Sequence, residues 1–129
     1  QDKLPSSGGS SLMDNRQLEA ALGMTEGELL VALGRQLAEQ DEHALPPSLA
    51  AARLRAEAWL RLHEQELQDA ICTNHKIRRA ATHSDGELAA AVLDVILGGF
   101  GQVAPITVAV LLTKRGVARY CEAFWTHAT

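Results

Sequence analysis

Two side chains that could bind a metal ion stand three residues apart in the middle of the chain. Cys72 and His75 would lie on one face of a helix, and a thiolate with an imidazole is a ligand pair for zinc. Three further residues could complete the set in space, namely His83, Cys121 and His127. In the alternative interpretation, Cys72 is a small buried residue beside Ile71, and His75 closes a helix, where a partly positive ring is favourable. A single CxxH half-site is far less specific than paired CxxC motifs. We therefore predict no metal site and no cofactor.

The same pair could act as a nucleophilic thiolate and its base, because a neighbouring imidazolium lowers the pKa of a thiol. The sequence supplies no third group to orient the base, no glycine-rich phosphate loop and no GxSxG turn. Three carboxylates fall on a helix whose charge pattern is typical of a solvated face: Glu64, Glu66 and Asp69. We expect no catalytic residues and no enzyme.

Basic residues gather in two places, which are residues 76–79 and 114–119. The first group contains Lys76, Arg78 and Arg79, and the second contains Lys114, Arg115 and Arg119. Either group could bind a phosphate or an acidic partner, but basic residues at helix C-termini also stabilise the helix dipole without any ligand. We favour the second interpretation.

One histidine and a group of aromatic residues near the carboxyl end are further candidates for a functional site. His63 interrupts an apolar stripe, so we expect a core histidine that is hydrogen-bonded to a backbone or carboxylate partner rather than a ligand. The aromatic residues near the carboxyl end could form a docking surface or pack back onto their own domain: Tyr120, Phe124 and Trp125. Packing back is the commoner outcome.

Composition indicates one helical domain that must position these side chains. The 129 residues are 47% apolar and 22% charged, which is close to the globular average. Alanine and leucine dominate, and β-branched and aromatic residues are scarce before residue 92. We expect an all-α fold, a single compact bundle of four to six helices over residues 13–129. Residues 1–12 are rich in Ser, Gly and Pro, and are predicted to be a flexible linker or a remnant before a native start at Met13.

The net charge and the number of cysteines indicate which kind of partner and which cellular compartment to expect. The formal net charge of −4 gives no electrostatic reason to approach nucleic acid. Residues 17–29 superficially suggest a helix-turn-helix, but the recognition helix expected at 26–40 is acidic, so we predict no nucleic-acid partner. Cys72 and Cys121 could pair, yet the chain is not cysteine-dense and shows no secretory signal. We expect free thiols and a cytoplasmic protein.

Capping residues predict where helices begin. Thr25 with Glu28, and Ser84 with Glu87, have the spacing of capping boxes. Ser48 is predicted to cap a long spine helix over about 48–74. Apolar residues recur along it near 3.5-residue spacing: Leu49, Ala52, Ala56, Trp59, Leu60, Leu67, Ala70 and Ile71.

Shorter segments complete the bundle. Asp14 can cap a short helix that ends at Gly23. Residues 75–83 could continue the spine helix or form a loop. Gly116 could kink or end the last helix.

The most apolar stretch of the chain runs from 88 to 112, and within it residues 95–112 carry no charge. Its length is near that of a membrane-spanning helix. Four residues at its centre disfavour one continuous helix: Gly98, Gly99, Gly101 and Pro105. We therefore predict a buried helical hairpin over about 85–113. Asp94 discriminates the two interpretations, because it would be costly at lipid depth and acceptable when solvated or paired.

These patterns favour a non-enzymatic α-helical interaction module, an adaptor or a self-associating subunit that binds a protein partner or itself and no small-molecule substrate. The general pattern is similar to that of small helical proteins of bacterial defence and toxin systems, without a motif that would carry over the role of any residue. One alternative is a membrane-active protein that inserts the hairpin 88–112, with Lys114 and Arg115 on the cytoplasmic flank. The second alternative is a metal-dependent sensor built on Cys72 and His75.

Overall fold

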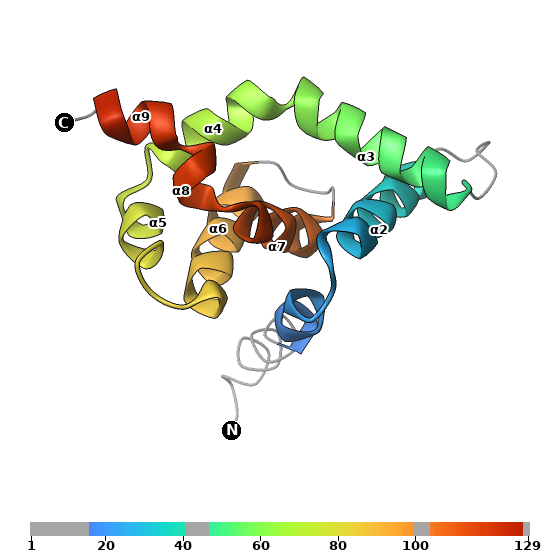
Figure 1. Ribbon diagram of the computed structural model, residues 1–129, viewed down its shortest axis with the longest axis horizontal. Helices are drawn as coiled ribbons and strands as arrows, with labels where there is room; N and C mark the ends of the chain where they lie inside the picture. Colours follow the sequence, from blue (N-terminus) through green and yellow to red (C-terminus); the bar gives the residue numbers. More distant parts are fainter. Residues whose placement is uncertain (1–15, 41–46, 100–103, 128–129) are drawn as a thin grey trace.

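Helices make up all of the regular secondary structure in the part of the chain that the structure describes. A computed structural model describes residues 16–40, 47–99 and 104–127. Residues 16–22 are helical, and eight labelled helices follow (Figure 1): α2 (Glu26–Glu39), α3 (Leu49–Leu62), α4 (Glu64–Cys72), α5 (His75–Ala80), α6 (Asp85–Gly99), α7 (Pro105–Arg115), α8 (Val117–Tyr120) and α9 (Glu122–His127). The all-α prediction is confirmed, but the helices are more numerous than the four to six expected, because two expected elements are divided into shorter ones.

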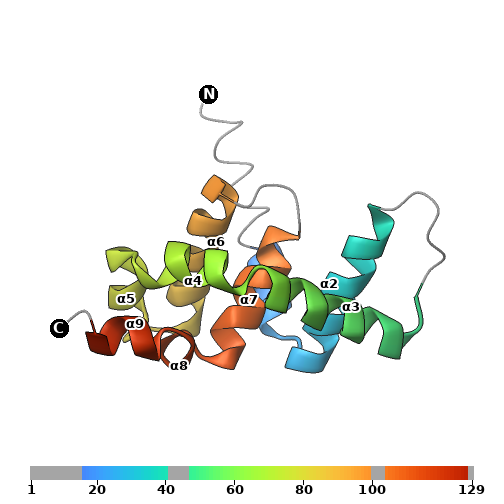
Figure 2. The ribbon, with the colours of Figure 1, turned by 90° about the horizontal axis from the view of Figure 1, so that it is seen from above.

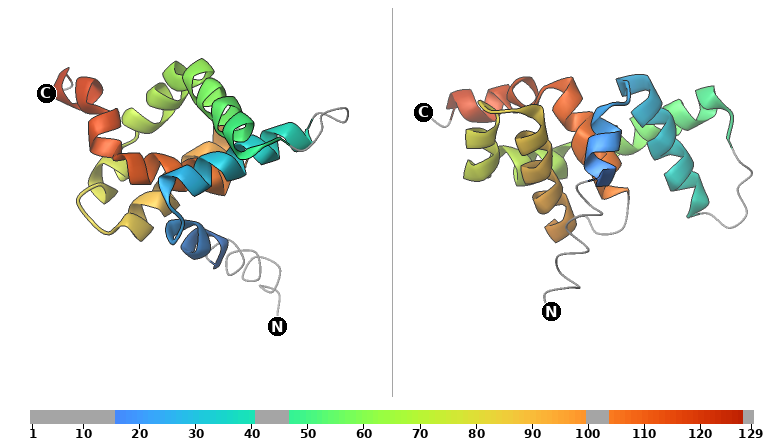
Figure 3. Two further views of the ribbon diagram at one scale, coloured as in Figure 1. Left: turned by 45° about the vertical axis from the view of Figure 1, so that its right-hand side comes forward. Right: turned by 90° about the horizontal axis from the view of Figure 1, so that it is seen from below.

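The helix α7 lies in the middle of the molecule. In Figures 1 and 2, α2 and α3 lie on one side of α7, while α4, α5, α8 and α9 gather at the opposite end. The helix α6 packs against α7 and is covered at its start by α5. The views in Figure 3 place the helical segment 16–22 beside α2. The molecule therefore has two ends that share one central helix.

Local capping signals position the helices as predicted. The Thr25 hydroxyl accepts from the Glu28 N–H at 3.1 Å, and the Thr25 N–H donates to the Glu28 carboxylate at 2.8 Å, which completes the capping box. Ser48 accepts from the backbone N–H three residues later at 3.1 Å. Ser84 accepts from the Glu87 N–H at 3.2 Å, and its own hydroxyl donates to the Glu87 carboxylate at 3.4 Å. These bonds satisfy N–H groups that have no partner inside the helix.

Small residues let α2 and α3 approach closely. A Cβ atom built on Gly34 would lie 1.9 Å from the carbonyl oxygen of Ala52, so only glycine fits at this position of α2. On α3, Ala52 and Ala56 are fully buried and Leu60 nearly so. The inner face of α3 is therefore bound to α2 at a distance that larger side chains would prevent.

The predicted spine helix over 48–74 is not continuous. It divides at His63, whose φ of −100° and ψ of 9° leave the helical region, into α3 and α4. The change of direction gives the two halves different neighbours, because α3 packs on α2 whereas α4 packs on α5 and α6. Periodicity along the sequence could not show this division, since the apolar stripe continues across it through Leu67 and Ile71.

The predicted apolar hairpin over 85–113 is confirmed as α6 and α7. Every residue of α7 from 107 to 113 is buried, and Val110 has an exposed fraction of 0%. Asp94 lies on the exposed side of α6. In the part of the chain that the structure describes, no helix is both long and apolar enough to cross a bilayer.

The sequence left two segments ambiguous, residues 75–83 and the end of the last helix at Gly116, and the structure shows both. Residues 75–80 form the short helix α5, with Asn74 as its cap. Gly116 ends α7 at a φ of +96°, a conformation that side-chain-bearing residues rarely adopt. The expectations for residues 1–12, Met13 and Asp14 lie outside the described residues.

Candidate interaction face

The two cysteines are joined in a disulfide, so the expectation of free thiols is wrong. Cys72 ends α4, and Cys121 lies between α8 and α9; their Cα atoms are 5.3 Å apart and their sequence separation is 49 residues. Both residues are buried. The pair forms because folding brings the end of α4 against the carboxyl-terminal helices, which is a tertiary contact without a local sequence signal.

The disulfide removes the basis of the alternative interpretations in which Cys72 binds a metal ion or acts as a thiolate. The sulfur of Cys72 is bonded to Cys121 and does not offer a thiolate. Cys72 also ends one helix while His75 begins the next, so the two residues do not share a helix face. His75 is thus not at the helix C-terminus where we expected it. In residues 16–40, 47–99 and 104–127, no three His, Cys, Asp or Glu side chains gather closely enough to hold a metal ion.

His63 makes the expected carboxylate contact but not in the core. Its Nδ1 lies 3.0 Å from a carboxylate oxygen of Glu66, and its ring centroid lies 4.6 Å from that of Trp59. The His63 side chain is 30% exposed, because the chain bends at this residue rather than burying it. Glu64, Glu66 and Asp69 are exposed, as predicted for a solvated face.

One arginine from each basic group is engaged within the domain. Arg115 donates to Glu26 at 2.7 Å and to Glu57 at 2.9 Å, which ties the end of α7 to α2 and α3. Partial burial opposes the charge of Arg115, but the two carboxylates outweigh it and raise the pKa of the guanidinium. Arg78 lies over the ring of Trp125, with 5.6 Å to its centroid. These contacts give the two arginines structural roles.

The aromatic tail packs back onto its own domain. The indole N–H of Trp125 donates to the carbonyl of Cys72 at 2.9 Å, and the Gln68 amide donates to the carbonyl of Tyr120 at 3.2 Å. The Tyr120 hydroxyl donates to the carbonyl of Glu64 at 3.4 Å. Burial, together with the negative charge of Glu64, raises the pKa of Tyr120 to about 12. The tail therefore closes the carboxyl-terminal end of the molecule.

The feature that sequence reasoning missed is a second apolar face on α3. In the described residues, four large apolar side chains are exposed: Leu54 and Leu62 lie on this face, whereas Leu49 lies at the start of α3 on its other side and Leu97 belongs to α6. Leu54 is 72% exposed and Leu62 is 77% exposed. With the exposed Ala51 and Ala58 they recur at helical spacing, and we call this set (Ala51, Leu54, Ala58 and Leu62) the outer stripe.

The outer stripe lies opposite the buried face of α3. At 100° per residue, the stripe is centred roughly 180° around the helix from Ala52, Ala56 and Leu60. A surface helix normally has one apolar face and one polar face. The sequence did contain this signal, since leucine and alanine appear on both sides of the same segment, but only the fold shows which side is covered.

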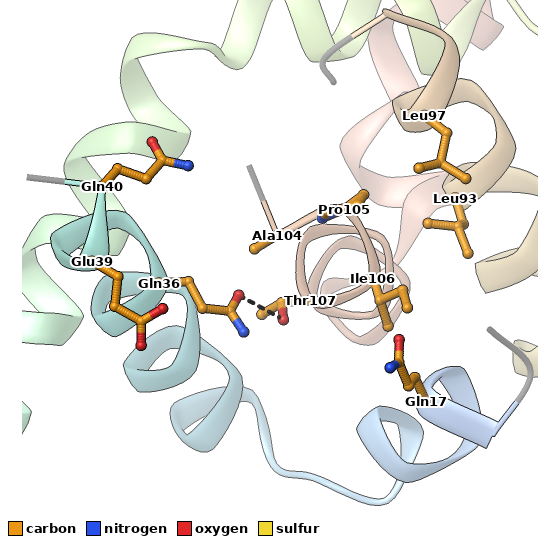
Figure 4. A pocket seen from close by; sticks show the side chains of 10 residues that line it. All are labelled: Gln17, Gln36, Glu39, Gln40, Leu93, Leu97, Ala104, Pro105, Ile106 and Thr107. Carbon is orange, nitrogen blue, oxygen red and sulfur yellow. Dashed lines mark hydrogen bonds between the residues drawn. The ribbon is translucent and has the colours of Figure 1, made fainter. Parts of the chain in front are cut away.

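A pocket of about 520 Å³ lies between α2, α6, α7 and the helical segment 16–22 (Figure 4). The apolar residues Leu93, Leu97, Pro105 and Ile106 lie on one side, where Gln17 stands beside Ile106, and the opposite side is polar, with Gln36, Glu39, Gln40 and Thr107. The Thr107 hydroxyl donates to the Gln36 side chain at 3.3 Å. Such a lining can accommodate an apolar group on one side and hydrogen-bond to a polar group on the other.

Comparison with known proteins found no relative of this chain. No family model, no curated protein and no solved structure matches this chain.

Proposed function

We propose that this protein is a non-enzymatic helical interaction module whose docking face is the outer stripe of α3, and that it binds a helix of another protein there. The observation that carries the proposal is the exposure of Leu54 and Leu62 on one line of a helix whose opposite face is already buried. An exposed apolar line of this kind is costly to leave in water and is typical of a binding surface.

The rigidity of α3 supports this assignment. Its inner face is held against α2 at the close Gly34–Ala52 contact, and Arg115 ties Glu57 of α3 to the end of α7. A helix fixed in this way presents its outer face without a large loss of conformational entropy on binding. An apolar stripe of about three turns fits the recognition mode in which helices pack side by side.

The disulfide supports function in an oxidising compartment, rather than in the cytoplasm we expected from the sequence. Disulfides persist where no thiol system reduces them, and this one joins two buried cysteines in the closed end of the molecule. We therefore place the encounter with the partner outside a reducing cytosol.

The size of the native complex tests the proposal. In gently prepared extracts of the producing cells, the wild-type chain should elute in a complex larger than the purified protein. The variant Leu54→Ser/Leu62→Ser should elute at the size of the purified protein, because it removes the apolar line. Its thermal stability should be unchanged to within about 0.5 kcal/mol, since both residues are exposed.

Leu97→Ser is the matched control, because it also removes an exposed leucine but lies on α6. This control should retain the complex. Loss of the complex in the Leu97 variant alone, or elution of the wild type at the purified size, would contradict the proposal.

A further inference from the structure

We infer that the partner helix is acidic: the outer stripe of α3 is built to receive an amphipathic helix that carries glutamate or aspartate on both borders of its apolar face. This inference rests on the proposed function, and names the chemistry of the partner. It is carried by two arginines that border the stripe and by the absence of any intramolecular ion pair for them in the described residues.

Arg55 and Arg61 stand on opposite borders of the outer stripe. At 100° per residue, Arg55 follows the edge formed by Leu62, and Arg61 precedes the edge formed by Leu54. Both arginines are exposed, and the ion pairs found among the described residues involve neither of them. The two borders are therefore free to bind carboxylates.

The carboxylate on α3 itself does not neutralise these borders. Glu57, four residues before Arg61, lines one pocket with Arg61 and Glu64, but its ion pair is with Arg115 at 2.9 Å. The outer surface of α3 is thus basic in a chain whose formal net charge is −4. A local charge that opposes the overall charge points to a partner of the same sign as the rest of this protein.

A second copy of this chain is a poor occupant for the same reason. Pairing two copies of α3 about a two-fold axis places the same surface on both sides. In an antiparallel pair centred on Ala58, Leu54 would meet Leu62 of the other copy, and each border would face the same border of the other copy, so Arg55 would face Arg55 and Arg61 would face Arg61. In a parallel pair the border of Arg55 would face the border of Arg61. Like charges at both borders disfavour either arrangement, whereas acidic borders would satisfy both arginines.

Peptide binding tests the inference directly. The full chain, with its disulfide intact, is titrated with a fluorescent helical peptide of about 20 residues, long enough to hold a helix. The peptide has leucine and alanine at the spacing of the outer stripe and glutamate on both borders. A matched peptide has lysine in place of every border glutamate. Binding is followed by fluorescence anisotropy at low and at high salt.

The acidic peptide should bind at least about tenfold more tightly than the lysine peptide, and the preference should weaken as salt is raised. The variant Arg55→Glu/Arg61→Glu should reverse the preference. The variant Lys76→Glu/Arg79→Glu is the control, because it reverses two exposed charges of α5 and should leave the preference unchanged.

The remaining outcomes separate this inference from the proposed function. Equal binding of both peptides that is lost in Leu54→Ser/Leu62→Ser would retain the docking face and overturn the acidic partner. A dimer by light scattering that depends on Leu54 and Leu62, without peptide binding, would make the second copy the occupant and overturn the inference. A monomer that binds neither peptide would overturn both.

Discussion

The two ends of the molecule are held together in different ways. At the end formed by α2 and α3, helices approach through glycine and alanine, and the packing is close enough that one added methyl group would meet backbone. At the end formed by α4, α8 and α9, short helices are fixed by a disulfide and by hydrogen bonds from Trp125 and Gln68. The first end leaves an apolar face open, whereas the second folds its aromatic side chains inward. In our proposal the α3 end binds the partner, whereas the carboxyl-terminal end is closed by its own side chains.

A charge buried in the central helix α7 should unfold both ends of the molecule. Val110 is fully buried in α7, so Val110→Asp would bury a carboxylate without a partner and cost more than about 4 kcal/mol. The expected result is loss of the cooperative thermal transition followed by circular dichroism. Ala118→Asp, at an exposed position of α8, is the control and should stay within about 0.5 kcal/mol of the wild type. An unchanged transition in the Val110 variant would mean that α7 is not the core.

Adding one methyl group should damage the α3 end selectively. Gly34→Ala places a Cβ atom against the carbonyl of Ala52, and we expect it to lower the free energy of unfolding by about 3 kcal/mol. Gly27→Ala is the matched control on the same helix, because its Cβ would meet only the Thr25 hydroxyl oxygen at 4.0 Å. The control should lose nothing and gain up to about 1 kcal/mol from helix propensity. Equal effects in chemical denaturation would refute the close contact.

Removing the disulfide should loosen the opposite end. Cys72→Ala/Cys121→Ala should lower the free energy of unfolding by about 2 to 4 kcal/mol, because the bond links residues 49 apart. Limited proteolysis should then cut first in α8 and α9, and the α2–α3 end should stay protected. First cleavage within α2 or α3 would contradict the division between the two ends.

The smallest effect concerns Tyr120, the chain's one tyrosine. Its pKa is raised from 10.0 to about 12, so the phenol is protonated in both folded and unfolded states below pH 10. Between pH 10 and about 12 the unfolded chain loses this proton while the folded protein keeps it, and stability falls as pH rises through that window.

A pH titration of the native protein, followed by the absorbance of the phenolate, measures the pKa of Tyr120 directly and should show a midpoint near pH 12. Tyr120→Phe should make the loss of stability over the same window shallower. A native midpoint near pH 10 would mean that Tyr120 is not held against α4.

Much of the fold could be predicted because its signals are local. Thr25 and Glu28 define the start of α2 within one turn, and Pro105 begins α7 after α6 has ended at Gly99. The division at His63 escaped prediction, because it depends on which helices α3 and α4 pack against. The disulfide also could not be predicted from the sequence, since residues 49 apart meet only after folding.

The proposed docking face could be predicted only in part. Leucine and alanine on both sides of residues 49–62 are visible in the sequence, but an exposed apolar stripe and a buried one have the same pattern. The fold decides between them by covering Ala52 and Ala56 with α2 and leaving Leu54 and Leu62 open.

The most direct test of the account is site-specific photo-cross-linking in the cells that make the protein. A photoreactive side chain replaces Ala58 in the outer stripe or, for comparison, the exposed Ala123 in α9. Ala58 should give a discrete cross-linked product that disappears when Leu54 and Leu62 are changed to serine, while Ala123 gives none. A product from Ala123 alone, or one from Ala58 that persists without the two leucines, would contradict the assignment of binding to α3.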